Sequence, residues 1–116
     1  MRDYAIVWLG VRIQVASARV LEQILDGSHD LVLRAQKFGL GSYVDTFGWT
    51  DDGAERRFLM VGTNLGMLGF KEGKNEFSAS PPRLERLRRS VQKKLSRAGI
   101  RRSAALHVLF HTEDEP

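Results

Sequence analysis

The sequence contains no cysteine, which excludes disulfides, thiol nucleophiles, thiol redox chemistry and cysteine-ligated zinc. It also lacks a long apolar run, and none approaches the ~18 residues that a membrane-spanning helix requires. A signal peptide is a poor match, because Asp3 offsets the basic start and Arg12 and Gln14 end the apolar stretch 4–11. We therefore expect a cytoplasmic protein that makes no membrane contact.

The composition is that of a globular protein. The 116 residues are 42% apolar and 28% charged, which distinguishes them from a disordered or fibrous chain. No internal repeat or linker divides the sequence. We expect one domain over residues 1–112 and an acidic, frayed tail over residues 113–116.

Apolar periodicity predicts the first elements. Residues 4–15 are rich in β-branched and aromatic side chains and are apolar on both faces at their start, as in a central strand. A short helix follows, for which Ser17 is a suitable N-cap and Gly27 a suitable C-terminal residue. Residues 30–38 fit the period of a helix or of a strand, and we favour a strand.

The remaining elements follow from turn residues and spacing. Residues 42–50 and 55–61 are expected to pair as a hairpin around Asp51–Gly53, because Asp-Gly is typical of a tight turn. A long amphipathic helix is predicted over residues 80–98, with two prolines in its first turn. Residues 104–112 alternate as a final strand.

This order of elements predicts an α+β domain whose mainly antiparallel sheet carries two helices on one face. By analogy with known folds that have this order of elements, we favour the ferredoxin-like, split βαβ arrangement. Tyr43, Phe47 and Trp49 alternate along one predicted strand. On an open face they would suit base stacking, and beneath the helices they would be core residues. We favour the core interpretation.

The charge is divided unequally along the chain. The net charge is +4, but residues 83–102 hold nine basic residues and only Glu85, giving +8 there and −4 elsewhere. Helical spacing places most of these cations opposite the leucine stripe. We call this set the cationic ridge, and its predicted anion-binding residues are Arg83, Arg86, Arg89, Lys93, Lys94, Arg97, Arg101 and Arg102.

Such a ridge can neutralise several phosphates, and arginine suits bidentate phosphate contacts. The alternative is the ordinary solvated face of an amphipathic helix. Such a face usually mixes signs, whereas Glu85 with Arg89 is the only favourable pair at i,i+4 here. The first hypothesis is therefore a small non-enzymatic binding module for an anionic partner, with nucleic acid favoured over an acidic protein surface or the protein's own acidic tail.

Glycines recur through residues 62–73, but their spacing matches neither a Walker loop nor a dinucleotide-binding turn. A bulged or close-packed edge hairpin, with short strands at residues 65–70 and 76–78, is the favoured interpretation. The alternative is a ligand-binding loop, whose candidate residues are Gly62, Asn64, Gly66, Gly69, Lys71 and Lys74.

The three histidines do not form an evident site. His107 and His111 lie about 13 Å apart on a strand, which is too far to share one metal ion. His29 fits a capping or surface role better than that of a general base. We predict no metal site, no cofactor and no catalytic residue.

Two rival functions stay open. One is an oligomeric protein-interaction or regulatory protein, such as a homodimer whose edge strands pair between subunits. The other is an enzyme acting on a phosphorylated small molecule, with residues 62–73 as a lid and His29 or Asp30 as acid or base. No recognisable catalytic constellation supports the enzyme, so we favour a protein without catalytic activity.

Overall fold

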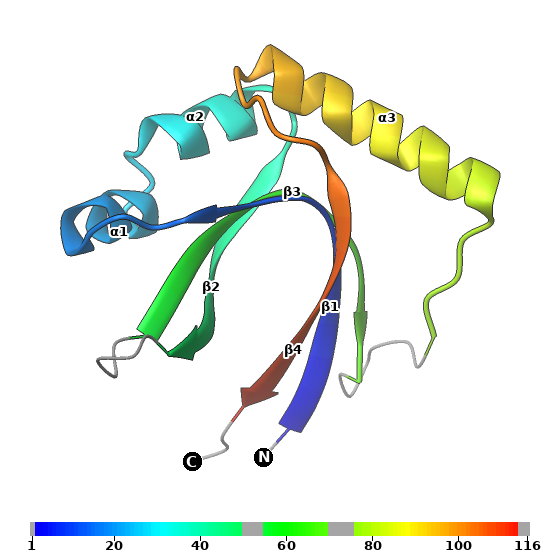
Figure 1. Cartoon of the computed structure of the whole chain (residues 1–116), viewed down its shortest axis with the longest axis horizontal. Coiled ribbons are helices and arrows are strands. Elements are labelled where there is room, and N and C mark those ends of the chain that lie inside the picture. The colour runs from blue at the N-terminus through cyan, green and yellow to red at the C-terminus, as the bar shows by residue number, and fades with distance from the viewer. Residues whose placement is uncertain (1, 50–54, 70–75, 114–116) are drawn as a thin grey trace.

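A computed structural model describes residues 2–49, 55–69 and 76–113 (Figure 1). Within these ranges the strands are β1 (Arg2–Gln14), β2 (Gly41–Trp49), β3 (Glu55–Leu68) and β4 (Ala105–Glu113), and the helices are α1 (Ala18–Leu25), α2 (Asp30–Lys37) and α3 (Pro81–Arg97). The strands form one antiparallel sheet in the order β2-β3-β1-β4. The predicted α+β class and split βαβ order are confirmed.

Local sequence signals explain where the first elements begin and end. The apolar strand β1 lies in the centre of the sheet, as its first half predicted. The Ser17 hydroxyl accepts a hydrogen bond from the N–H of Val20 (3.2 Å), so it caps α1. Gly27 follows α1 with a φ of 78°, the conformation that favours glycine after a helix.

The prediction of a strand over residues 30–38 is wrong, because these residues form α2. His29 caps this helix by accepting a hydrogen bond from the N–H of Leu31 (3.1 Å). The helical register buries Ala35 and leaves Leu33 51% exposed. In a strand, Leu33 and Ala35 would lie on the same face. Packing of Ala35 against the core therefore decides in favour of the helical period over the strand period.

The expected strand over residues 55–61 and the expected short strand over residues 65–70 are not separate elements, since β3 continues without a break to Leu68 beside β1. Gly62 does not break the strand but permits close approach of β3 to β1, because a Cβ on it would lie 2.2 Å from the carbonyl oxygen of Leu9. A bulge does occur: Val7 pairs with Gly66 and Trp8 with Asn64, which leaves Leu65 as the extra residue. It lies in the part of β3 that pairs with β1 only, beyond the last pair of β2 with β3 at Gly62, rather than in a separate edge hairpin.

Several sequence predictions fall partly outside the described residues. The turn at Asp51–Gly53, the candidate ligands Lys71 and Lys74, and the tail from residue 114 belong to this group. The strands that flank the turn, β2 and β3, pair as predicted. Residues 76–80 carry no strand, in contrast to the short strand expected at 76–78.

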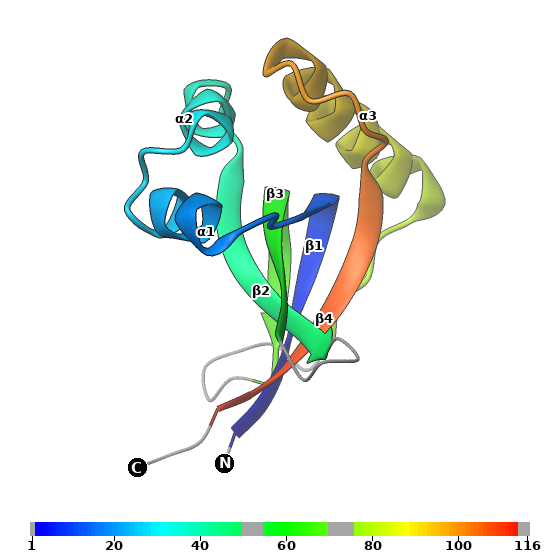
Figure 2. The same ribbon diagram turned by 60° about the vertical axis from the view of Figure 1, so that its left-hand side comes forward.

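The helices pack on one face of the sheet and gather at one end of the strands, opposite the two chain ends (Figures 1 and 2). No helix in the described ranges is long and apolar enough to cross a membrane. Ile24, Ala35, Val91 and Leu95 bring the three helices onto the main core, which also contains Leu9, Val11, Leu40, Leu59, Val61, Ala98, Ile100 and Ala104.

A second, smaller apolar cluster lies on the opposite face of the sheet. Trp8, Met60 and Leu109 are buried there, and Tyr43 packs against them. Tyr43 therefore packs in a core cluster, as favoured, but on the face away from the helices; the side chains of Phe47 and Trp49 lie outside the described part of the structure. The register pairs Tyr43 with Met60, on the same side as Trp8.

The strands bend across a row of small residues. Gly41, Gly62, Gly10 and Ala105 lie in register across all four strands. A Cβ on Gly10 would lie 2.1 Å from the carbonyl oxygen of Val61, so only glycine permits this approach of β1 to β3. The curve of β1 is visible in Figure 1. We call this set the small-residue row.

Candidate functional site

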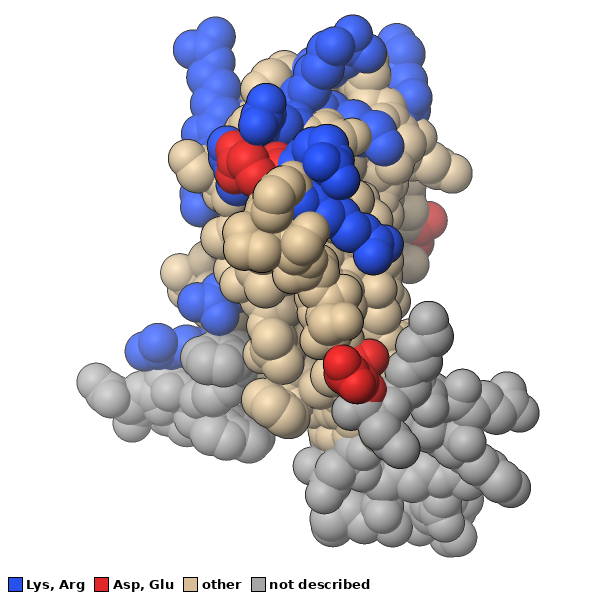
Figure 3. All heavy atoms as spheres, turned by 90° about the vertical axis from the view of Figure 1, so that its right-hand side faces the viewer, with Lys and Arg blue, Asp and Glu red and all other residues tan. Residues whose placement is uncertain are grey.

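The cationic ridge lies on the solvent side of α3. The Ser80 hydroxyl accepts a hydrogen bond from the N–H of Arg83 (3.3 Å) and thereby starts the helix. Val91 and Leu95 are buried against the core, so the opposite side faces solvent. Figure 3 shows Lys and Arg side chains gathered over this part of the molecule. The exposed ridge residues are Arg83, Arg86, Arg89, Lys93, Arg97, Arg101 and Arg102.

The only acidic residue of α3, Glu85, is bound mainly by Arg88. Arg88 donates two hydrogen bonds to the carboxylate, at 2.9 and 2.6 Å, while Nε of Arg89 lies 3.4 Å away. The hydrogen bond from Arg88 is the largest cause that holds the pKa of Glu85 below its ordinary value. Because Arg88 is not a ridge residue, this pair offsets little of the charge of the ridge.

The C-terminal end of α3 is held by a cation from α2. Arg34 donates a hydrogen bond from Nη1 to the carbonyl of Ala98 (2.6 Å) and pairs through Nε with Asp30 (2.9 Å). A cation at this end is favourable, because the last carbonyls of a helix carry partial negative charge. Arg34 therefore holds the C-terminal end of α3, from which the chain continues to the ridge residues Arg101 and Arg102.

The segment between α3 and β4 is held by one amide side chain. Gln92 donates to the carbonyl of Arg102 (2.9 Å) and accepts from the N–H of Ala104 (2.7 Å). This clamp places Arg102 between the helix and the sheet. Sequence reasoning missed Gln92; the available signal was a single uncharged amide within a helix otherwise rich in Arg and Lys.

The glycine-rich candidates do not converge on one point. Gly62 and Asn64 pair with Gly10 and Trp8, on the face away from the helices. A Cβ on Gly66 would lie on the other face, 3.8 Å from the ring of Phe77. The N–H of Gly66 donates a hydrogen bond to Oδ1 of Asn64 (2.9 Å) across the bulge. These residues thus build a strand irregularity, and they do not join the cationic ridge.

A polar group that sequence reasoning missed connects the two edge strands. Asp45 of β2 is only 3% exposed, and its Oδ1 lies 3.4 Å from Nε2 of His111 in β4. Burial raises the pKa of Asp45, against the attraction of His111 and Arg12. Tyr4 stacks on His111 with ring centroids 5.1 Å apart. The contact depends on the curvature of the sheet.

A metal centre is not formed by the described part of the chain. There, no three His, Asp or Glu side chains come together closely enough to hold an ion. The eight predicted cations thus lie on α3 and in the segment that follows it. The described glycine-rich candidates lie apart from them, in or directly after β3. Comparisons with protein-family models, curated proteins and solved structures found no match, so the function is inferred from the site itself.

Proposed function

We propose that the protein is a non-enzymatic module that binds the phosphate backbone of nucleic acid through the cationic ridge of α3. The observation that carries this proposal is the exposure of the ridge cations along one helix face whose sole acidic residue, Glu85, is bound by Arg88. An arginine-rich surface of this kind suits phosphate, because each guanidinium can donate two parallel hydrogen bonds to it.

The ridge has the length of a short run of phosphates. Arg86 and Arg97 are separated by about 16 Å along the axis, at 1.5 Å of rise per helical residue. Arg89 and Lys93 lie between them on the same face. Four contacts to phosphates of a duplex predict a slope of about −3.6 for the logarithm of affinity against the logarithm of salt concentration.

Binding should depend little on base sequence. Asn and Gln are the side chains that read adenine, and the ridge contains neither. The one Gln of α3, Gln92, is occupied by the segment before β4. We therefore expect backbone contacts to supply the affinity.

The test is a charge reversal at the ridge with a matched control. R86E/R97E removes two ridge cations and leaves the Glu85 pairs untouched. R19E/R56E makes the same change of net charge at exposed residues of α1 and β3. Fluorescence anisotropy with a labelled duplex at several salt concentrations measures both affinity and slope.

The ridge variant should bind at least tenfold more weakly at low salt, with a slope reduced by about two units. The control should keep the slope of the wild type. Equal losses in both variants would mean that only net charge matters, and the proposal would fail. Absence of binding by the wild type at low salt would also refute it.

A second candidate function, self-association, is favoured by the exposed edge of β4. Leu106, Val108 and Phe110 share one face and are 43%, 48% and 83% exposed. The strand contains no Lys, Arg, Asp, Glu or Pro from Ala105 to Thr112, although such residues normally protect an edge. We assign this edge to a second copy of the chain.

The side chains of β4 suit an antiparallel two-fold pairing. If the two-fold axis passes through Val108, Leu106 of one subunit would lie opposite Phe110 of the partner subunit. Val108 would lie opposite Val108 of the partner subunit. Leu106 borders an apolar hollow of about 240 Å³ that Leu9 and Leu84 also line. The phenyl ring of the partner subunit would have a place there.

Light scattering coupled to size exclusion tests this association. The wild type should shift from monomer to dimer as its concentration rises, and F110D should stay monomeric. L33D, a matched change at an exposed leucine of α2, should behave as the wild type. A wild type that stays monomeric throughout would eliminate this candidate and leave the ridge unaffected.

A further inference from the structure

The exposed apolar side chains of β4 lie on the same side of the sheet as α3. Leu106 and Val108 pair with Leu9 and Val7 of β1, and Leu9 belongs to the core beneath the helices. Leu106 also lines the hollow of about 240 Å³ together with Leu84 of α3. The free edge of β4 therefore runs beside α3, within the helix layer's side of the sheet.

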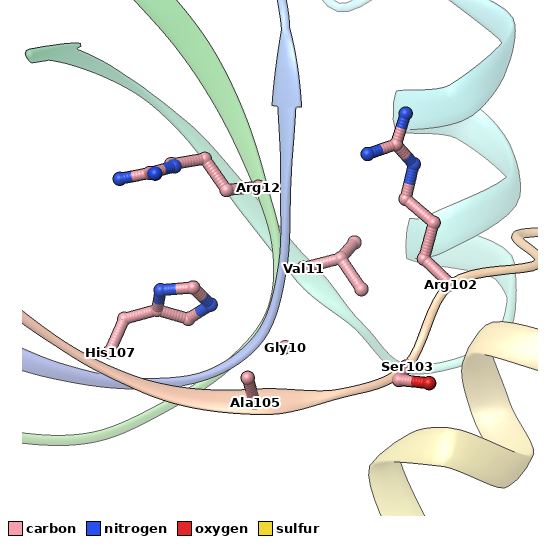
Figure 4. A pocket seen from close by; sticks show the side chains of 7 residues that line it. All are labelled: Gly10, Val11, Arg12, Arg102, Ser103, Ala105 and His107. Atoms are coloured by element: carbon pink, nitrogen blue, oxygen red, sulfur yellow. The ribbon is translucent and has the colours of Figure 1, made fainter.

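The start of β4 sets the length of this edge. Figure 4 shows β1 bending away from β4 at Gly10, next to Ala105, while the chain before Ala105 continues past Ser103 to Arg102. Gln92 of α3 holds this segment by a hydrogen bond to the carbonyl of Arg102 (2.9 Å). The edge that a partner strand can pair with thus begins at Ala105.

Two hollows on this side of the sheet fit a two-fold axis at Val108. The first borders Leu106, and a second, of about 250 Å³, is lined among others by Val108, Phe110 and Leu68. With the axis at Val108, Phe110 of the partner subunit lies beside the first hollow and Leu106 of the partner subunit beside the second. Each copy then supplies and receives an apolar side chain, and residues 105–111 of the two strands pair.

Such a dimer places both cationic ridges on one surface. Two identical strands that pair antiparallel at a sheet edge are related by a two-fold axis perpendicular to the sheet, so the helices of both copies lie on the same face. The ridge is on the side of α3 away from the sheet, because Val91 and Leu95 are buried against the core. Both ridges therefore face in the same direction.

The two α3 helices would lie close together. Helix α3 contacts β1, and β1 is the direct neighbour of β4. The β1 strands of the two copies are thus three strand spacings apart, or about 14 Å. The major groove of a duplex is about 12 Å wide, so each of its two backbones can meet one ridge. The backbones of a duplex are also related by two-fold axes, which a single strand lacks.

The charges of the two ridges oppose this dimer until an anion is bound. Residues 83–102 carry a charge of +8 in each copy. Below 0.1 M salt the Debye length exceeds about 10 Å, so repulsion across about 14 Å is only partly screened. Glu85, the acidic residue of α3, lines the hollow beside Leu106 and is bound by Arg88. It therefore lies next to the partner subunit and leaves the charge of the ridge in place.

We propose that two copies of the chain, paired through β4, bind one nucleic-acid duplex with their two ridges, and that the duplex drives this pairing. The inference rests on the two functions proposed above, and the figures given there for the ridge apply to each bound chain. Binding free energies are reciprocal, so the duplex strengthens dimerisation by the same factor by which dimerisation strengthens duplex binding. The preferred ligand is accordingly a duplex rather than a single strand.

The test makes use of the absence of cysteine from the chain. Val108→Cys places one thiol at the two-fold axis, opposite the same thiol of the partner subunit, so a short bismaleimide reagent can link the two copies. Leu33→Cys, at an exposed position of α2, is the matched control. Each variant is diluted until it is monomeric, and the rate of cross-linking is measured alone, with a short duplex and with one of its single strands.

The duplex should accelerate the cross-linking of V108C at least about tenfold and the single strand less than about twofold, while L33C responds little to either. R86E/R97E in the V108C background should abolish the acceleration, because the ridge no longer holds the duplex. In fluorescence anisotropy the wild type should bind the duplex cooperatively, with a salt slope near about −7 from two ridges. F110D, checked by thermal unfolding, should bind without cooperativity and with a slope of about −3.6.

Equal acceleration of V108C and L33C would overturn the inference, because crowding of chains on the duplex would then explain both. Equal acceleration by duplex and single strand would also overturn it. Duplex binding with the same affinity and slope in the wild type and F110D would overturn the pairing and leave the ridge in place. A wild type that does not bind at low salt would instead refute the proposed function, so the two failures are distinguishable.

Discussion

Gly10→Ala is expected to be strongly destabilising because of the small-residue row. The new Cβ would lie 2.1 Å from the Val61 carbonyl oxygen and 2.8 Å from Cα of Gly62. Since such contacts do not fall below 3.0 Å, β1 and β3 would have to separate by about 0.9 Å. The backbone hydrogen bonds between β1 and β3 on either side of the Gly10–Gly62 pair would then become too long to form. Overpacking and the loss of about two hydrogen bonds together predict about 2–4 kcal/mol of destabilisation.

The control is Gly41→Ala in the same row. Its Cβ would lie 3.5 Å from Trp8, an ordinary van der Waals distance, so a change within about 0.5 kcal/mol is expected. Urea denaturation measures both free energies of unfolding, and thermal unfolding should show Gly10→Ala melting about 10–15 °C lower. If both variants were equally stable, the close approach of β1 and β3 would not be what requires glycine.

Three further variants test other contacts. Arg34→Met should lower the free energy of unfolding by about 1–2 kcal/mol in urea denaturation, because the carbonyl of Ala98 loses a charged donor. Gln92→Ala should lower the free energy of unfolding by about 1–2 kcal/mol in urea denaturation, because the carbonyl of Arg102 and the N–H of Ala104 both lose their side-chain partner. Burial raises the folded-state pKa of Asp45, so the stability that this residue contributes is largest below its unfolded pKa and falls as pH rises through the folded pKa. Urea denaturation from about pH 4 to 7 should therefore show Asp45→Asn gaining stability relative to the wild type.

The parts of the fold that sequence reasoning predicted correctly rest on local signals. Ser17 and Ser80 cap helices because their hydroxyls reach N–H groups three residues away. Gly27 and Gly99 adopt a positive φ after helices. The central position of β1 follows from apolar side chains on both of its faces.

The incorrect or missing predictions depend on contacts between distant segments. Residues 30–38 fit two periods, and only the packing of Ala35 against the core selects the helix. The glycines of β3 resemble breaks until β1 lies beside them. Asp45 and His111 are far apart in the chain, and meet only because the sheet curves. No local pattern contains that information.

The placement of β1 also has a consequence for how the protein folds. The first strand of the chain is central, and its two neighbours end at Leu68 and Glu113. The pairing of Arg2 with Glu113 closes a loop of nearly the whole chain. Loop-closure entropy delays such contacts, so we expect the domain to fold more slowly than a helical bundle of the same length. On the ribosome, β1 must wait for β4 to emerge before both of its edges are covered.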